Sequence, residues 1–294
     1  MLRALVASLR PQQWAKNLFV FASLTFSHNL AEPGAVARAT TAFVIFCALS
    51  GAIYLINDVT DLEKDRLHPQ KRHRPIASGR LGVPSALAAA AVLLVVGLVW
   101  SARLSGAFLL VALAYVAMLV LYSVRFKNVV ILDVLMVAGG FVLRAMAGAV
   151  AIGVAISGWL LICTVLLALF LALGKRRHEY LTLEADAVRH RPILAEYSPA
   201  FLDQMISVVT ASTVTAYALY TMSPETVARF HTHLLPATLP FVLYGIFRYL
   251  YLLYKRELGG NPSELFLSDP PLLLNVLCWV LAVLVIIYGT GTPP

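Results

Sequence analysis

Long apolar runs separated by short polar or charged stretches dominate the chain. Runs such as Ala86–Trp100, Gly106–Tyr122 and Leu272–Tyr288 are long enough to cross, or nearly cross, the ~30 Å hydrocarbon core of a bilayer at about 1.5 Å rise per residue. Gly and Ala are scattered through these runs, which suits close helix packing in lipid, and no stretch alternates as a barrel strand does. The pattern predicts an all-α membrane protein. We expect nine spans, at about 16–31, 37–56, 85–103, 106–123, 129–151, 157–174, 203–222, 233–254 and 271–289.

Basic residues are divided unequally between alternate loops. One side of the predicted spans holds 18 of the 23 Lys and Arg residues. The positive-inside rule places this side in the cytoplasm, with the N-terminus inside and the C-terminus outside. An odd number of spans requires the same arrangement, so the two observations agree.

Composition narrows the class further. The chain is 60% hydrophobic and 13% charged, with a mean hydropathy of +0.81, whereas soluble domains are about 25% charged. These values exclude a secreted or disordered protein and a soluble nucleic-acid-binding domain. Basic loops that set topology and attract anionic lipid headgroups account for the net charge of +8 without nucleic acid. The three cysteines, Cys47, Cys163 and Cys278, lie in apolar runs without zinc-type spacing, so we interpret them as packing residues.

Acidic residues gather at the end of the second predicted span. Fifteen are present in all, and four of them lie within positions 58–65. Asn57, Asp61 and Asp65 are related by i, i+4 and i+8, which places three oxygen ligands on one helical face. Stacked carboxylates repel one another unless a cation neutralises them, and Mg²⁺ prefers oxygen ligands and completes its shell with substrate phosphates. We predict that these three residues bind Mg²⁺ in a metal–phosphate site; a solvated helix end is the alternative.

A basic segment follows the acidic cluster directly. Arg66, Lys71, Arg72 and Arg74 all lie within the nine residues after Asp65. Bases that hold phosphate beside acids that hold Mg²⁺ are the usual components of a polyphosphate site. For any single base, the alternative is that it only sets membrane topology.

These motifs resemble a known family. Asn57-Asp58-x-x-Asp61-x-x-x-Asp65, followed by Arg74-Pro75-x-x-x-Gly79, is similar to the first aspartate motif of the UbiA superfamily of intramembrane prenyltransferases. The resemblance covers essentially the whole chain and includes Tyr122-Ser123-x-x-x-Lys127 after the fourth predicted span.

The resemblance implies a fold and a site. It implies one polytopic domain over residues 1–294, a UbiA-like barrel of nine helices in the bacterial inner membrane. The active site would lie at the cytoplasmic mouth, under a cap formed by loops 57–84 and 174–202. Asp58, Asp61 and Asp65 would be catalytic, holding a diphosphate through Mg²⁺.

The loop after the sixth predicted span departs from the family members that prenylate aromatic rings. Those members carry a second Asp-x-x-x-Asp motif, whereas this loop contains Gly174-Lys175-Arg176-Arg177-His178-Glu179. Three consecutive bases in place of a second carboxylate pair suit a substrate with an additional phosphate that no metal neutralises.

This loop, with Arg10-Pro11-x-Gln13-Trp14-x-Lys16-Asn17 and Gly140-Phe141-Val142-Leu143-Arg144, is similar to the branch of the superfamily that acts on decaprenyl phosphate. The resemblance implies Mg²⁺-dependent transfer of phosphoribosyl from 5-phosphoribosyl diphosphate to a polyprenyl phosphate in the lipid bilayer. Diphosphate would be released, and the product would feed lipid-linked arabinose donors for cell-envelope polysaccharide. The substrate-binding positions expected are Lys16, Asn17, Arg66, Lys71, Arg72, Arg74, Tyr122, Lys127, Arg144, Lys175, Arg176, Arg177 and Glu179.

Two other functions fit the sequence less well. An aromatic prenyltransferase that uses a prenyl diphosphate is disfavoured by the missing second Asp-x-x-x-Asp motif. A lipid transporter is disfavoured because no convincing internal repeat is found and the charges concentrate on one face. The prenyl chain length stays open, as does the oligomeric state, with a homo-oligomer as one option.

Arg144 lies inside an apolar span, where a charge is expensive and normally faces the bundle interior or a cavity. Asp133 is eleven residues earlier on the same helical face, about 16 Å away along the axis, so a direct pair is excluded. Arg144 then either faces a phosphate or substrate, or makes structural hydrogen bonds.

Overall fold

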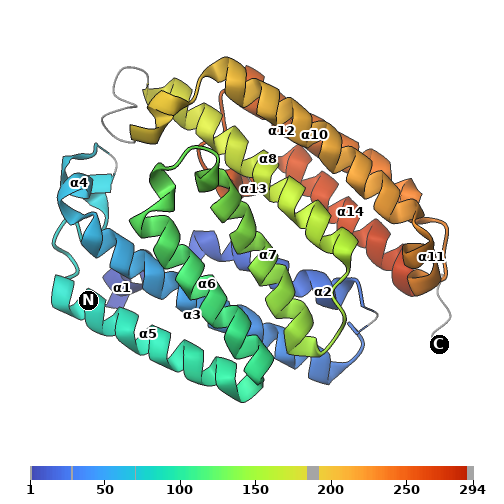
Figure 1. The fold of residues 1–294 in the computed structure, drawn as a ribbon, viewed down its shortest axis with the longest axis horizontal. Helices are drawn as coiled ribbons and strands as arrows, with labels where there is room; N and C mark the ends of the chain where they lie inside the picture. Colours follow the sequence, from blue (N-terminus) through green and yellow to red (C-terminus); the bar gives the residue numbers. More distant parts are fainter. Residues whose placement is uncertain (1, 28, 70, 184–191, 290–294) are drawn as a thin grey trace. The chain divides into compact units, whose positions relative to one another are not determined.

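The computed structural model describes residues 2–27, 29–69, 71–183 and 192–289, and the regular secondary structure within these ranges is helical (Figure 1). Two compact units are present. The first contains Met1–Val129 and Gly140–Ala155, and the second contains Val130–Gly139 and Ile156–Pro294. One helix, α7 (Leu132–Ile152), supplies residues to both units. The prediction of one polytopic domain stays a prediction.

The first unit holds the N-terminal elements and the second unit the C-terminal ones. The first comprises α1 (Leu2–Ser8), η1 (Pro11–Phe21), α2 (Ala22–Thr25), α3 (Pro33–Thr60), α4 (Leu62–Leu67), η2 (Lys71–His73), α5 (Val83–Leu104), α6 (Gly106–Val124) and η3 (Phe126–Asn128). The second comprises α8 (Gly158–Leu183), η5 (Pro192–Glu196), α10 (Pro199–Met222), α11 (Pro224–Phe230), η6 (Leu235–Thr238), α12 (Leu239–Lys255), α13 (Pro262–Ser268) and α14 (Pro270–Gly289).

Helix starts follow local chemistry. Pro33 and Pro199 occupy the first positions of α3 and α10, where proline has no amide hydrogen to lose. Ser105 caps α6 and Ser198 caps α10, each accepting a hydrogen bond from the amide three residues later.

The core of the first unit lies around α3, which packs against α5, α6 and η1. Phe46, Phe108 and Tyr115 are fully buried there, and the ring centroids of Phe46 and Tyr115 are 4.7 Å apart. Ala42 and Ala112 are also fully buried. Small residues between helices let the backbones approach closely, which is how helices associate in lipid.

The second unit packs α8 along α10, and α12 against both α10 and α14. The rings of Phe170 and Tyr249 lie 5.1 Å apart at the centre of its core. A buried polar link adds to this packing, because Trp279 Nε1 donates to Tyr217 Oη over 3.0 Å and Tyr217 Oη lies 2.7 Å from Thr238 Oγ1. α10, η6 and α14 are thereby joined.

Eight helices among the described residues are long and apolar enough to cross a membrane. They correspond to the second through ninth spans predicted from the sequence, although α8 extends to Leu183, beyond the predicted end at 174. The all-helical membrane fold is confirmed. The count of nine spans and the orientation of the termini stay predictions.

The first predicted span, 16–31, is not one continuous α-helix. Residues Pro11–Phe21 form a 3₁₀ helix, and only Ala22–Thr25 continue as an α-helix. Two contacts with α7 hold this segment in place. Ser23 Oγ donates to the carbonyl oxygen of Ala145 over 3.2 Å. A Cβ placed on Gly148 would lie 1.9 Å from the carbonyl oxygen of Val20, so η1 sits where only glycine leaves room.

Candidate active site

The acidic motif lies where α3 passes into α4. The amide of Asp61 donates to the carbonyl oxygen of Asn57, and the amide of Asp65 to that of Asp61, each over 2.8 Å. The backbone therefore keeps the helical i, i+4 pattern through the junction, although Asp61 itself ends one helix and precedes the next. Asn57, Asp61 and Asp65 lie on three successive turns, as the spacing predicts.

Basic side chains neutralise the aspartates. Arg74 Nη1 donates to Asp65 Oδ2 over 2.6 Å and lies 3.1 Å from Asp58 Oδ1, so one nitrogen bridges two carboxylates. Arg10 Nη2 donates to the same Oδ1 of Asp58. Lys127 Nζ is 3.5 Å from Asp61 Oδ1. Asp58 and Asp65 are each 3% exposed, and such carboxylates need these partners because burial penalises an unpaired charge.

The donor set fits a hard cation without forming a closed metal centre. No group of three His, Cys, Asp or Glu side chains is gathered for a metal within the described ranges. The predicted ligands include an amide, Asn57, which such a group would not contain. Asp61 is 32% exposed, and among the residues that the structure describes its ion pair is the long one with Lys127 at 3.5 Å, so its carboxylate is accessible. Amide and carboxylate oxygens on successive turns are ligands of the kind that Mg²⁺ takes.

The remaining predicted residues of the first unit lie at separate places. Arg66 pairs with Glu63 on the exposed side of α4, at 2.9 Å. Lys71 and Arg72 belong to η2, Lys16 to η1 and Tyr122 to the last turn of α6.

Arg144 lies in a buried cluster with Asn17. Its Nε donates to Asn17 Oδ1 over 2.7 Å, its Nη1 to the carbonyl oxygen of Gly140 over 2.9 Å and its Nη2 to Tyr115 Oη over 2.6 Å. Asn17 Nδ2 is also 3.2 Å from Cys47 Sγ. Arg144 is 5% exposed. These contacts support the structural interpretation of Arg144 and Asn17, because they join η1, α3, α6 and α7; their substrate-binding roles stay predictions.

Arg176 in the second unit is equally buried. Its Nε donates to Asp133 Oδ2 and its Nη1 to Glu179 Oε2, each over 2.6 Å. Tyr197 Oη donates to Asp133 Oδ1 over 2.7 Å and accepts from the amide of Ile131 over 2.8 Å. Burial and the hydrogen bond to Asp133 raise the pKa of Tyr197 well above its usual range. Arg176 therefore orients Glu179, and Lys175 Nζ lies 3.7 Å from the other oxygen of that carboxylate.

The strained residue Ile131 belongs to the same network. Its φ of 68° is the left-handed region, which is unfavourable for a β-branched side chain. The hydrogen bond from its amide to Tyr197 Oη holds this conformation at the start of α7.

Arg177 joins three helices of the second unit. Its Nε donates to Asp203 Oδ1 over 2.6 Å, and its guanidinium lies 4.0 Å from the ring centroid of Tyr254. Tyr254 Oη donates to the same oxygen of Asp203 over 2.8 Å. α8, α10 and α12 are thus tied at one end of the unit.

Sequence reasoning did not assign a role to several of these partners. Asp203 and Tyr254 make the contacts described above but belong to no spacing that signals a site, and Arg10 entered only as the first residue of the motif that ends at Asn17, without a role of its own. A partner for Asp133 could have been expected from the sequence, because an acidic residue at the start of an apolar span requires one. Of the predicted cap, residues 184–191, which include Arg189 and Arg191, lie outside the described residues.

Comparisons with known proteins agree on the family to which this chain is similar. The model of the UbiA prenyltransferase family matches residues 18–269. The chain is 34% identical to a decaprenyl-phosphate phosphoribosyltransferase of Corynebacterium glutamicum over 97% of this chain and 86% of that protein. It is 31% identical to the protein of the same name from Mycolicibacterium smegmatis, over 94% and 90% of the two chains.

Solved structures agree on the fold. The structure of a UbiA homolog from Archaeoglobus fulgidus bound to GPP and Mg²⁺ superposes with a TM-score of 0.75, at 18% identity, over 97% of this chain and 99% of that one.

Proposed function

This chain belongs to the UbiA prenyltransferase family, and we propose that it transfers a 5-phosphoribosyl group from 5-phosphoribosyl diphosphate to a polyprenyl monophosphate. Diphosphate is the other product. The observation that carries the proposal is the similarity over nearly the full chain to relatives named for phosphoribosyl transfer to decaprenyl phosphate.

The helical face that carries Asn57, Asp61 and Asp65 supports binding of the diphosphate group. In the proposal Asn57, Asp61 and Asp65 hold Mg²⁺, which supplies charge neutralisation for the leaving diphosphate. Arg74 and Lys127 now neutralise the same carboxylates. With Mg²⁺ bound to Asp61 and Asp65, Arg74 and Lys127 would be available for phosphate oxygens. In the proposal Arg74 and Lys127 would pair with substrate phosphate instead of Asp65 and Asp61, and no charged side chain would be left buried without a partner.

The reaction needs positioning more than proton transfer. An oxygen of the lipid phosphate forms a bond to C1 of the ribosyl group while the bond from C1 to the diphosphate oxygen breaks, and the electron pair leaves with diphosphate. The attacking phosphate is already an anion, so no general base is required. The side chains hold the two reactants together and stabilise the departing charge.

The basic residues in the C-terminal part of α8 support binding of a second anionic group. Lys175 is 41% exposed, whereas Arg176 is 4% exposed and held between Asp133 and Glu179. Lys175 is therefore better placed than Arg176 for the 5-phosphate or the lipid phosphate, whereas Arg177, 13% exposed, would have to leave Asp203 to bind one. We infer a cytoplasmic active site in a bacterial inner membrane from the basic loops, and a product that feeds cell-envelope polysaccharide synthesis.

A choice between donors tests the proposal. Purified protein is supplied with Mg²⁺, labelled 5-phosphoribosyl diphosphate and a polyprenyl monophosphate, and the label is followed into the organic phase. A parallel reaction contains labelled prenyl diphosphate and an aromatic acid. We expect transfer in the first reaction alone; turnover of the prenyl diphosphate alone would overturn the proposal.

A further inference from the structure

Arg10 lies at the turn between α1 and η1, and it contacts the acidic motif without belonging to it. Its Nη2 donates to Asp58 Oδ1, the same oxygen that lies 3.1 Å from Arg74 Nη1. Two guanidinium groups therefore meet at one carboxylate oxygen. Asp58 is buried, whereas the side chains of Arg10 and Arg74 are each 29% exposed. The buried carboxylate thus holds two cations at a surface that a ligand can reach.

The guanidinium of Arg10 is oriented by an aromatic ring as well as by the carboxylate. Its central carbon lies 4.9 Å from the centroid of the Tyr54 ring. Nη2 is used by Asp58, and the donors on Nε and Nη1 have no hydrogen-bond partner among the described residues. An arginine has five N–H donors in a planar arrangement that matches the oxygens of phosphate. The remaining donors of Arg10 are therefore suited to a phosphate group.

The backbone at Arg10 is held in an unfavourable conformation. Its φ of 52° lies in the left-handed region, which a residue with a Cβ rarely adopts. Hydrogen bonds fix the turn on both sides. The amide of Arg10 donates to the carbonyl oxygen of Ala7 over 3.2 Å, and its carbonyl oxygen accepts from the amide of Gln13 over 2.8 Å. Strain of this kind gathers at ligand-binding sites, so it supports a binding role for Arg10.

The position of Arg10 selects one phosphate group of the proposed reaction. Arg74, its neighbour on Asp58, also pairs with Asp65 over 2.6 Å. Asp65 is one of the residues proposed to hold Mg²⁺, and the cation would bring the diphosphate of the donor to this carboxylate. A diphosphate carries more negative charge than one Mg²⁺ cancels, so cations beside the metal stabilise it. Arg10 and Arg74 supply two such cations.

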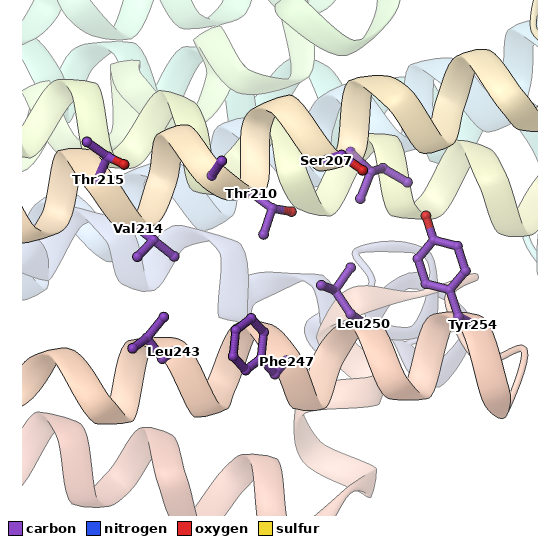
Figure 2. Close-up of a pocket in the computed structure, with 10 residues that line it drawn as sticks. Ser207, Thr210, Val214, Thr215, Leu243, Phe247, Leu250 and Tyr254 are labelled. Atoms are coloured by element: carbon purple, nitrogen blue, oxygen red, sulfur yellow. The ribbon is translucent and has the colours of Figure 1, made fainter.

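A groove in the second unit offers no such charge. It lies between α10 and α12, has a volume of about 590 Å³, and none of the ten described residues that line it is charged. Figure 2 shows Val214, Leu243 and Phe247 among the side chains around this space. Such a lining suits hydrocarbon and not phosphate. Charge, and not the size of a hollow, therefore marks the place where a diphosphate binds.

We propose that Arg10 binds the diphosphate of the donor beside Arg74, as a further substrate-binding residue of the proposed reaction. Asp58 keeps the two guanidinium groups together and is a positioning residue, and Tyr54 supports the plane of Arg10. The nature of the donor rests on the proposed function. The diphosphate does not, because 5-phosphoribosyl diphosphate and a prenyl diphosphate both carry one.

Binding of inorganic diphosphate to the full-length protein tests this assignment. The detergent-purified protein, with Mg²⁺ present, is titrated with inorganic diphosphate by isothermal calorimetry. We expect Arg10→Lys to weaken the binding about tenfold, because lysine keeps the charge beside Asp58 but loses donors that meet phosphate oxygens. Arg3→Lys, at an exposed position of α1, is the matched control and should bind as the wild type does. Equal affinities of Arg10→Lys and the wild type, or no saturable binding by the wild type, would overturn the inference.

A double-variant cycle separates ligand binding from a structural role. Tyr54→Leu removes the ring beside Arg10 without changing any charge, and it should weaken diphosphate binding about threefold. Added to Arg10→Lys it should have a smaller effect, because the ring acts through the guanidinium. A structural role alone would lower the thermal unfolding midpoint of Arg10→Lys and leave its diphosphate affinity unchanged, which would contradict the inference.

Steady-state kinetics distinguishes the role of Arg10 from the proposed reaction itself. If phosphoribosyl transfer occurs, Arg10→Lys should raise the KM for 5-phosphoribosyl diphosphate and leave the KM for the polyprenyl monophosphate unchanged. The reverse would overturn the assignment to the diphosphate. If no phosphoribosyl transfer occurs but Arg10→Lys still weakens the binding of inorganic diphosphate, the proposed reaction fails and the role of Arg10 stands.

Discussion

Arg74 donates from Nη1 to Asp65 Oδ2 over 2.6 Å, and the carboxylate of Asp65 is 4% exposed. The same nitrogen lies 3.1 Å from Asp58 Oδ1. A residue of the basic segment therefore holds two residues of the acidic segment in place. The acidic segment at 57–65 and the basic segment that contains Arg74 are therefore bound to each other, and the first prediction follows from this contact.

Arg74→Lys should lower transfer about tenfold or more, mainly through a higher KM for the phosphoribosyl donor. Lysine keeps the charge but loses the planar fork that bridges carboxylate and phosphate oxygens. The measurement is steady-state kinetics with varied donor. Arg38→Lys, at an exposed position paired with Glu32 at 3.7 Å, is the control and should have no effect. An unchanged donor KM in Arg74→Lys would contradict the assignment.

Asp133→Asn should destabilise the second unit by about 3 kcal/mol, the cost of leaving a buried cation short of its counter-charge. Asp133 is 0% and Arg176 4% exposed, so water cannot replace the lost partner. The free energy of unfolding in detergent gives the measurement, with the exposed Glu264→Gln as control.

The double variant Asp133→Leu/Arg176→Met separates the charge from the packing. Apolar residues of similar volume often replace a buried ion pair without loss of stability. Unfolding close to the wild type would identify the lost neutralisation of Arg176, which among the described residues keeps only the Glu179 ion pair, as the cause of the loss in Asp133→Asn. If Asp133→Asn behaves like Glu264→Gln, the pair contributes nothing and the prediction is wrong.

Gly148→Ala should displace η1 from α7 and lower the thermal unfolding midpoint by several degrees. The added Cβ would lie 1.9 Å from the carbonyl oxygen of Val20, and backbone cannot move aside as a flexible side chain can. Gly158→Ala is the matched control, since a Cβ there meets nothing within 4 Å. Equal midpoints for both variants would show that η1 does not pack as described.

Stability should fall in acid in a way that depends on Asp269. Hydrogen bonds from Arg248, at 2.8 and 3.1 Å, hold the pKa of Asp269 below its usual range. A carboxyl whose pKa is depressed by folding adds stability above its unfolded pKa of about 3.9, and this stability is lost as the pH falls further. Thermal unfolding between pH 6 and pH 3 should show a smaller decline in Asp269→Asn than in the wild type. Parallel declines would speak against the ion pair.

The spans and the acidic motif could be read from the sequence because both depend on local periodicity. Runs such as 106–123 and 271–289 predict α6 and α14 almost to the residue. The i, i+4 spacing of Asn57, Asp61 and Asp65 predicts the turns observed at the junction of α3 and α4. Neither inference requires knowledge of distant residues.

What the sequence could not reveal depends on contacts between residues far apart in the chain. Arg10 meets Asp58 across 48 positions and Arg144 meets Asn17 across 127. The close approach of Val20 to Gly148 is a further contact that hydropathy does not record. Such partners decide whether a base faces substrate or stabilises the fold, so residue roles were harder to predict than residue positions.

Transfer of labelled phosphoribose by wild type and Asp61→Asn, measured side by side, tests the central claim most directly. Asp61 is 32% exposed, so the variant should fold, and Glu63→Gln two residues away is its control. With Mg²⁺ we predict label in the organic phase for the wild type and Glu63→Gln, and about 100-fold less for Asp61→Asn, since a metal ion contributes several kcal/mol to charge stabilisation. Chelation of Mg²⁺ should abolish transfer in every sample. Full activity of Asp61→Asn, or transfer that persists in the chelator, would contradict the account.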